Sequence, residues 1–145
     1  SSDLVGIWTA TPFRNVRIEH NALLRSNPGQ GWQVGLFSNN GGPRGLVVKN
    51  NIIDGKYGKL PGTFSHNLYT RLSPQQNADQ LGEGSRYVDD LSKIFVDPDK
   101  RNFRLKPGSP AIDAGTDLGV KDDFAGNERP KGDAPDIGPY EFKKP

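Results

Sequence analysis

The chain has 145 residues, a formal net charge of +2, 18 glycines, 12 prolines, and neither cysteine nor methionine. This length favours a single domain, and the lack of cysteine excludes disulfide frameworks, thiolate metal sites and cysteine-dependent catalysis. No apolar run approaches the ~20 residues that span a bilayer, so no membrane partner is predicted. No nucleic-acid motif accompanies the pI of about 8.9, so no nucleic-acid partner is predicted either.

Positive charge is concentrated in the first half of the chain. Residues 1–75 carry eight Lys/Arg and three Asp/Glu, whereas residues 76–145 carry eleven and fourteen. A polyanionic ligand is therefore expected to prefer the first half. The chain opens on Ser-Ser-Asp and enters strand-like sequence at once, which predicts a processed product or a piece of a longer protein.

Two short motifs recur in the first half with nearly the same spacing. Residues 5–9 (VGIWT) reappear as 34–38 (VGLFS), an offset of 29, and residues 16–23 (VRIEHNAL) reappear as 46–53 (LVVKNNII), an offset of 30. The units contain strand-like segments and turns without helical periodicity. They therefore predict one strand-turn-strand unit used twice, as in a solenoid.

Stacking of the two copies as parallel strands predicts which side chains face inward. Successive strand residues point to opposite faces, so Val16 and Ile18 are expected to stack inward on Leu46 and Val48. The residues between them are expected to face solvent.

The second motif also predicts contacts between coils. Glu19 would lie over Lys49 and form a surface ion pair, and Asn21 would bond to Asn51 in an asparagine ladder. A degenerate third copy at 64–69 (FSHNLY) follows at a shorter interval. The repeats are therefore expected to end near this point.

The remainder of the chain lacks the repeat. Residues 72–85 are polar and predict a surface loop, 94–98 and 103–105 predict short strands about a turn, and 109–115 predict a helical or 3₁₀ turn. Residues 122–142 are rich in Gly, Pro and Asp. Because a solenoid must cover its open end, we expect an irregular C-terminal cap.

The second half carries a family resemblance. The segments 95–115 (FVD…NFRLKPGSPAIDAG), 123–129 (DFAGNER) and 136–141 (DIGPYE) resemble the C-terminal end of secreted bacterial right-handed parallel β-helix proteins. The resemblance implies an all-β fold, with residues 1–71 as the last coils of a right-handed parallel β-helix and 72–145 as loop and capping segment. It also implies secretion, to the extracellular space or the periplasm.

That family contains polysaccharide lyases, glycoside hydrolases, epimerases and surface proteins of unknown activity. The resemblance therefore implies the C-terminal part of an extracellular polysaccharide-degrading enzyme, a lyase of acidic polysaccharide first and a glycoside hydrolase second, whose main catalytic residues lie upstream. The alternative is a non-catalytic carbohydrate-binding or structural β-helix module. An exposed first coil further predicts association with the N-terminal part of the same protein or with another copy.

Few residues in this chain suit lyase chemistry, which needs a base and a cation that neutralises the substrate carboxylate. The catalytic candidates are His66, Tyr69 and Arg71, and the substrate-binding candidates are Trp32, Lys49, Tyr69 and Arg71. His66 equally fits a structural role, because it precedes a ladder asparagine. Trp32 lies in a Gly-Gln-Gly turn, which favours an exposed platform for a sugar ring.

The aspartates between residues 117 and 136 suggest a calcium ion as a cofactor, with Asp122, Asp123 and Asp136 as candidate ligands. The spacing is not that of an EF-hand. The alternative is that these carboxylates cap turns and that Asp123 or Asp136 pairs with Arg129 to hold the C-terminal segment.

Overall fold

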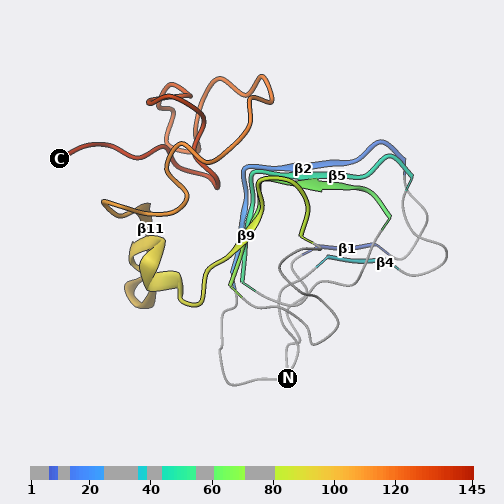
Figure 1. Ribbon diagram of the computed structural model, residues 1–145, viewed down its shortest axis with the longest axis horizontal. Helices are drawn as coiled ribbons and strands as arrows, with labels where there is room; N and C mark the ends of the chain where they lie inside the picture. The colour runs from blue at the N-terminus through green and yellow to red at the C-terminus, as the bar shows by residue number, and fades with distance from the viewer. Residues whose placement is uncertain (1–6, 10–13, 25–35, 39–43, 55–60, 71–80) are drawn as a thin grey trace.

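The computed structural model describes residues 7–9, 14–24, 36–38, 44–54, 61–70 and 81–145, with the backbone alone for 7–9 and 36–38. Within these residues the regular structure is almost entirely strand (Figure 1). The strands are β1 (Ile7–Thr9), β2 (Arg17–Glu19), β3 (Ala22–Leu23), β4 (Leu36–Ser38), β5 (Val47–Lys49), β6 (Ile52–Ile53), β7 (Thr63–Ser65), β8 (Leu68–Tyr69), β9 (Arg86–Tyr87), β10 (Phe95–Asp97) and β11 (Asn102–Leu105). Two 3₁₀ turns, η2 (Leu91–Lys93) and η3 (Pro98–Lys100), complete an all-β arrangement.

Strands from successive copies of the repeat pair in parallel. The sheet orders are β1-β4, β2-β5-β7 and β3-β6-β8-β9. The register joins Ile7 to Leu36 and Arg17 to Val47, which confirms the offsets of 29 and 30 residues. Figure 1 shows β2 and β5 running together and turning through the same corner.

The parallel pairing includes a third and a fourth copy. Val48 pairs with Phe64 on β7, and Ile52 pairs with Leu68 on β8, which confirms the copy predicted at 64–69. β9 then pairs with β8. The parallel sheet therefore continues past residue 71, into the segment expected to be loop and cap.

The predicted alternation of side chains along the strands is confirmed. Ile18, Leu46 and Val48 are buried together in a first hydrophobic cluster, and Val16 packs against it. Arg17, between the two inward residues, is exposed. The sheets β2-β5-β7 and β3-β6-β8-β9 thus share an apolar interior.

The predicted ion pair between coils is wrong. Glu19 and Lys49 are in register on β2 and β5, but the Glu19 carboxylate pairs with Arg17 of its own strand. Residues two apart on a strand share a face. Arg17 therefore reaches Glu19 without crossing to the next coil.

The asparagine ladder is confirmed and is longer than predicted. The amide N–H of Asn21 donates to Oδ1 of Asn51 at 2.9 Å, and that of Asn51 donates to Oδ1 of Asn67 at 3.0 Å. The amide N–H of Asn67 donates to Oγ of Ser85 at 3.0 Å. A serine therefore takes the asparagine position in the fourth copy.

The residue before each ladder position forms the corner. His20, Asn50 and His66 have φ of 54°, 58° and 52°, in the left-handed region. This conformation turns the chain sharply between the two sheets. Asn and His adopt it more readily than most residues with a side chain.

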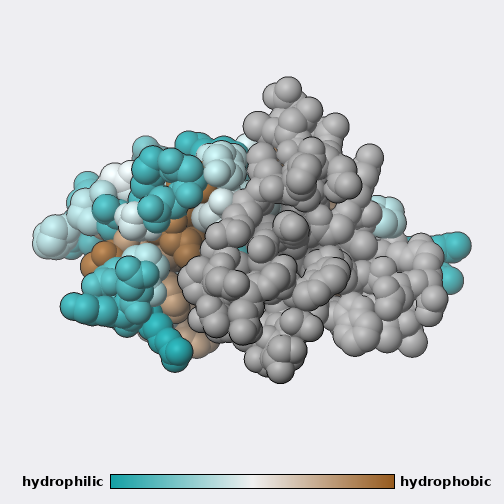
Figure 2. Space-filling model, turned by 90° about the horizontal axis from the view of Figure 1, so that it is seen from below, coloured by the Kyte–Doolittle hydropathy of each residue, from teal (hydrophilic) through white to brown (hydrophobic). Residues whose placement is uncertain are grey.

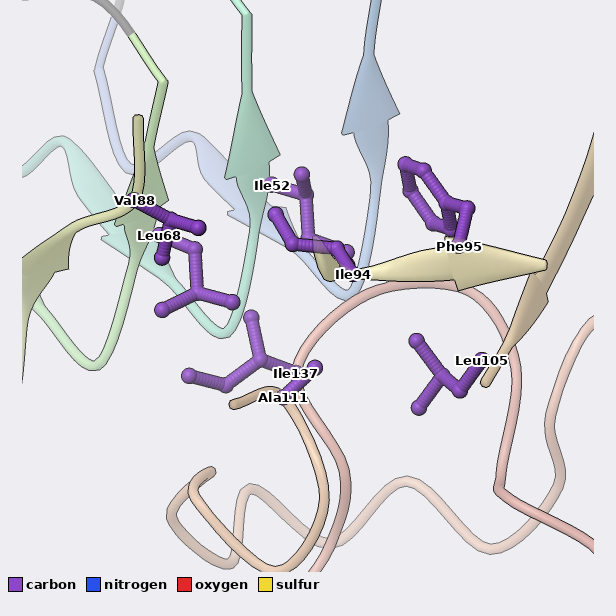
Figure 3. Packing of buried hydrophobic residues seen from close by; sticks show 8 residues of the cluster. All are labelled: Ile52, Leu68, Val88, Ile94, Phe95, Leu105, Ala111 and Ile137. Atoms are coloured by element: carbon purple, nitrogen blue, oxygen red, sulfur yellow. The ribbon is translucent and has the colours of Figure 1, made fainter. Parts of the chain in front are cut away.

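The C-terminal segment packs on the outer face of the β3-β6-β8-β9 sheet. A second hydrophobic cluster joins outward side chains of this sheet to residues far along the chain (Figure 3). Its buried members are Ile52, Leu68, Val88, Ile94, Phe95, Leu105, Ala111 and Ile137. The described contacts of this segment therefore run along the outer face of a parallel sheet, whereas the sequence predicts a cover for the open end of the repeats.

The two strands predicted near 94–98 and 103–105 form an antiparallel hairpin, β10 and β11. Phe95 and Phe103 meet edge to face, with ring centroids 5.4 Å apart. The expected turn at 109–115 is made by a bond from the Ile112 N–H to the Ser109 carbonyl, without a helix.

Candidate functional site

The sequence candidates on the coils are not gathered into one site. Tyr69 is fully buried in the first hydrophobic cluster, because on β8 it follows the outward residue Leu68. A ring in that position does not contact a polysaccharide, so its assignment as a catalytic or substrate-binding residue is not supported. Trp32 and Arg71 lie outside the residues that the structure describes.

Lys49 and His66 are partly exposed, and the geometry favours a structural role for His66. Gly84 occupies the corner position of the fourth copy, and a Cβ there would lie 2.5 Å from the imidazole of His66. The ring therefore packs over the next corner, in one row with Asn50. Lys49 lies on the outward face of β5, beside Ser65 of β7.

The carboxylates proposed as calcium ligands are already used by the protein. Asp123 accepts bonds from the N–H groups of Ala125, Asn127 and Glu141. Burial alone would raise the pKa of Asp123, but these bonds and the Asn127 side chain outweigh it and lower the pKa.

Asp136 is occupied in the same way, because it accepts the N–H groups of Asp113 and Phe142. Asp122 is exposed at an isolated bridge to Glu128. In the described part of the chain no three His, Cys, Asp or Glu side chains are placed to hold a metal ion. This donor set does not fit calcium and supports the turn-capping alternative.

Arg129 holds the C-terminal segment, but not through the predicted partners. Its guanidinium lies 3.0 Å from the Glu141 carboxylate, and it donates to the backbone carbonyl of Asp136 at 3.0 Å. It also reaches Nδ1 of His20 at 2.6 Å. Both side chains of the ion pair are almost completely buried. The Asp123 or Asp136 carboxylate predicted from the sequence is thus replaced by Glu141.

A groove of about 660 Å³ lies beside β9 and differs from the coil surface in its chemistry. It combines three cationic side chains with an aromatic ring that is 46 % exposed. It is lined by Arg86, Tyr87, Val88, Asp89, Lys93, Lys106, Pro107, Gly108 and Pro110.

The charges in this groove leave it net positive. Lys93 pairs with Asp89 at 2.7 Å, and the hydrogen bond from Lys93 lowers the pKa of this carboxyl. Lys106 donates from Nζ to the Ser92 carbonyl at 3.0 Å. Arg86 and Lys106 therefore add positive charge beyond the internal pair.

Local folding explains why these residues meet. Val88, the residue after β9, is buried and fixes the strand against the outer cluster. The N–H of Lys106 donates to the carbonyl of Ile94, and the N–H of Ser109 donates to the carbonyl of Lys106, both at 3.1 Å. These bonds fold residues 106–110 into a turn that forms the other wall.

A second groove, of about 670 Å³, has a less selective lining. It mixes acidic and basic side chains of the C-terminal segment. It is lined by Ile112, Asp113, Lys131, Gly132, Asp133, Asp136, Phe142, Lys143 and Lys144. Three carboxylates oppose its lysines, so it suits an anionic ligand less well than the groove beside β9.

The groove beside β9 was missed because its residues follow the segment expected to be a loop. One signal was present: Gly84-Ser85 precedes Arg86-Tyr87 as His66-Asn67 precedes Leu68-Tyr69. Cations of the first half are also exposed, as at the parallel bridge between Arg14 and Arg44. The cation-rich groove, however, lies in the half with negative net charge.

On the face shown in Figure 2, the described residues are mostly hydrophilic, with an apolar strip among them. No helix among the described residues is long and apolar enough to cross a bilayer.

No family model, curated protein or solved structure matches this chain.

Proposed function

We propose that the chain forms the last coils of a right-handed parallel β-helix, exported from a bacterial cell. Three parallel sheets in register, a ladder through Asn21, Asn51, Asn67 and Ser85, and repeated left-handed corners support this architecture. β1, β2 and β3 are each the first strand of their sheet. We propose that another coil pairs there, from the same protein or a second copy.

We propose that this part of the protein binds an acidic polysaccharide in the groove beside β9. The observation that carries the proposal is an open groove whose lining includes the exposed residue Tyr87 together with Arg86 and further cations. An aromatic ring stacks on the C–H face of a sugar. Guanidinium and ammonium groups bind the sugar carboxylate by charge-assisted hydrogen bonds. An open groove admits a long chain whose ends project beyond it.

The activity that we propose for the whole protein is a polysaccharide lyase. In such a reaction a base removes the proton next to the uronate carboxylate, and a cation neutralises that carboxylate. The described residues do not gather these groups, so we place the catalytic cluster elsewhere and assign substrate binding to this part. The alternative is a carbohydrate-binding module without activity.

Binding to polygalacturonate and alginate, with the neutral glucan pullulan as reference, tests the proposal. We expect Arg86→Ala and Lys106→Ala each to weaken binding of the acidic polymers about tenfold, because each removes a charge-assisted contact. Lys100→Ala is the matched control. It removes the same charge from a side chain that is 87 % exposed and outside the groove.

The control variant should bind within twofold of the wild type. Equal binding of pullulan, or equal loss in the Lys100→Ala variant, would contradict a groove specific for acidic sugars. Ultraviolet absorbance of the unsaturated product, measured on the whole protein, distinguishes the lyase from the module.

A further inference from the structure

Phe124 is a large apolar side chain on a turn that the protein holds firmly. It is 82 % exposed. Its N–H donates to the Pro139 carbonyl at 2.8 Å, and Asp123 accepts the N–H groups of Ala125 and Asn127 on the same turn. The exposure therefore belongs to a fixed conformation. A single exposed ring is common on protein surfaces, so its neighbours decide whether it forms part of a binding site.

Phe124 does not stand alone on this surface. Its ring meets that of Tyr140 edge to face, with centroids 5.9 Å apart and an interplanar angle of 86°. The guanidinium of Arg104 lies 5.5 Å from the centroid of the Tyr140 ring. Two aromatic rings and a cation therefore lie side by side, and the groove beside β9 also combines aromatic and cationic residues.

The chain connects this aromatic pair to the groove. Arg104 on β11 and Lys106 lie on either side of the buried residue Leu105. Residues two apart on an extended segment share a face, and their Cα atoms are ~6.6 Å apart. The side chain of Arg104, beside Tyr140, therefore extends from the same outer face of this segment as the side chain of Lys106 in the groove. The two surfaces are neighbours along one extended segment.

We infer that Phe124 and Tyr140 form a second sugar-stacking site, joined by Arg104 to the groove, so that one acidic polysaccharide chain binds along both. This inference rests on the function proposed above. It extends that function, because the ligand must be long enough to contact both sites. The apolar surface consists of two rings, whereas a stable protein interface buries about 800 Å² on each partner. Arg104, exposed beside the Tyr140 ring, supplies the cation that suits a sugar acid.

Oligogalacturonates of increasing length test the inference by calorimetry. For the wild type, affinity should rise with length until the ligand reaches both sites, because the second contact is made within one complex. We expect Phe124→Ala to bind short oligomers as the wild type does and long oligomers about tenfold more weakly. Phe124→Tyr keeps a ring and should restore the binding of long oligomers.

Val96→Ala is the matched control, because Val96 is 51 % exposed on the neighbouring strand β10 and contacts neither ring in the described interactions. It should leave all affinities unchanged. Unchanged binding of long oligomers by Phe124→Ala, or an equal loss for short and long ones, would overturn the second site while the groove stands. Failure of the wild type to bind any oligomer would instead refute the proposed function. Thermal midpoints of all variants confirm that they fold.

Discussion

At the scale of single residues, one asparagine joins three copies of the repeat. The Asn51 side chain is fully buried and donates from Nδ2 to the carbonyls of Ile18 and Lys49 at 2.8 and 2.9 Å. Its Oδ1 accepts the backbone N–H of Asn21 at 2.9 Å. A buried polar group that is fully bonded stabilises one arrangement strongly, because every alternative leaves groups without partners.

Replacement of Asn51 by alanine should destabilise the protein by about 3–5 kcal/mol, because it leaves several buried backbone groups without partners. Asn21→Ala is the control, since Asn21 occupies the first described rung and is exposed. It should cost about 1 kcal/mol or less. Urea denaturation of both variants measures the difference. Equal effects would show that the ladder contributes no more in the interior than at its edge.

The ladder was predictable, whereas the direction of Tyr69 was not. Asn21 and Asn51 recur at a fixed offset, and a repeated polar residue in a strand motif has few explanations. As a candidate catalytic or substrate-binding residue, Tyr69 would have to face solvent. Its inward direction depends on which residue follows the corner, and a one-residue shift of that point reverses every side chain after it.

At the scale of elements, the fourth copy depends on a close approach of two backbone segments. Gly82 has φ of +92°, and a Cβ there would lie 2.0 Å from the carbonyl oxygen of Phe64. The turn that begins here carries Ser85 to the ladder and then β9 to its place beside β8. The groove therefore depends on a glycine outside it.

Gly82→Ala should destabilise the protein by about 3 kcal/mol or more, because the new methyl group has no space and the left-handed conformation is strained. It should also weaken binding of acidic polysaccharide, because Arg86 and Tyr87 follow on β9. Gly119→Ala is the control: it has φ of +75° and nothing within 4 Å of the added Cβ. It should cost about 1 kcal/mol, with no loss of binding. Similar costs for both variants would show that the turn yields to the methyl group.

The paired strands of the first three copies could be predicted from their repeated motifs, whereas β9 has only the weak match of residues 84–87 to 66–69. The offset of 30 residues sets the register of β2 against β5 directly, and the offset of 29 sets that of β1 against β4. β9 has two residues, follows a serine instead of an asparagine, and exposes both its side chains. A short strand with that composition has no periodicity that sequence analysis can detect.

At the scale of the whole molecule, one sheet separates two apolar clusters. Ile53 on β6 packs inward with the first cluster, whereas Ile52 packs outward with Ile137 of the C-terminal segment. A hydrogen bond between Arg129 and His20, which lie 109 positions apart in the sequence, adds a polar contact. Such contacts follow from the path of the irregular segment, so the repeats do not predict them. Apolar and polar contacts therefore both hold the C-terminal segment against the parallel strands.

The tie between His20 and Arg129 makes stability depend on pH. Burial, with the neighbouring charge of Arg129, lowers the pKa of His20 from 6.5 to about 4. The guanidinium offers only donors, so Nδ1 of a neutral imidazole must accept. Between pH 6.5 and 4, His20 is protonated in the unfolded chain and neutral in the folded chain. The free energy of unfolding should therefore fall by about 1.4 kcal/mol for each unit by which the pH decreases in this window.

Other titratable groups face the same network, and a matched variant separates their effect. Burial raises the pKa of Asp136 and of Glu141, so their protonation favours the folded state and opposes the histidine as pH falls. His20→Asn leaves these carboxyls in place and introduces the residue that occupies the next corner, Asn50, with φ of 58°. Urea denaturation from pH 7 to pH 5 should show the wild type losing about 2 kcal/mol relative to this variant. Parallel pH profiles for the two proteins would mean that His20 accepts its proton in the folded state, and that the C-terminal segment is held without a neutral imidazole.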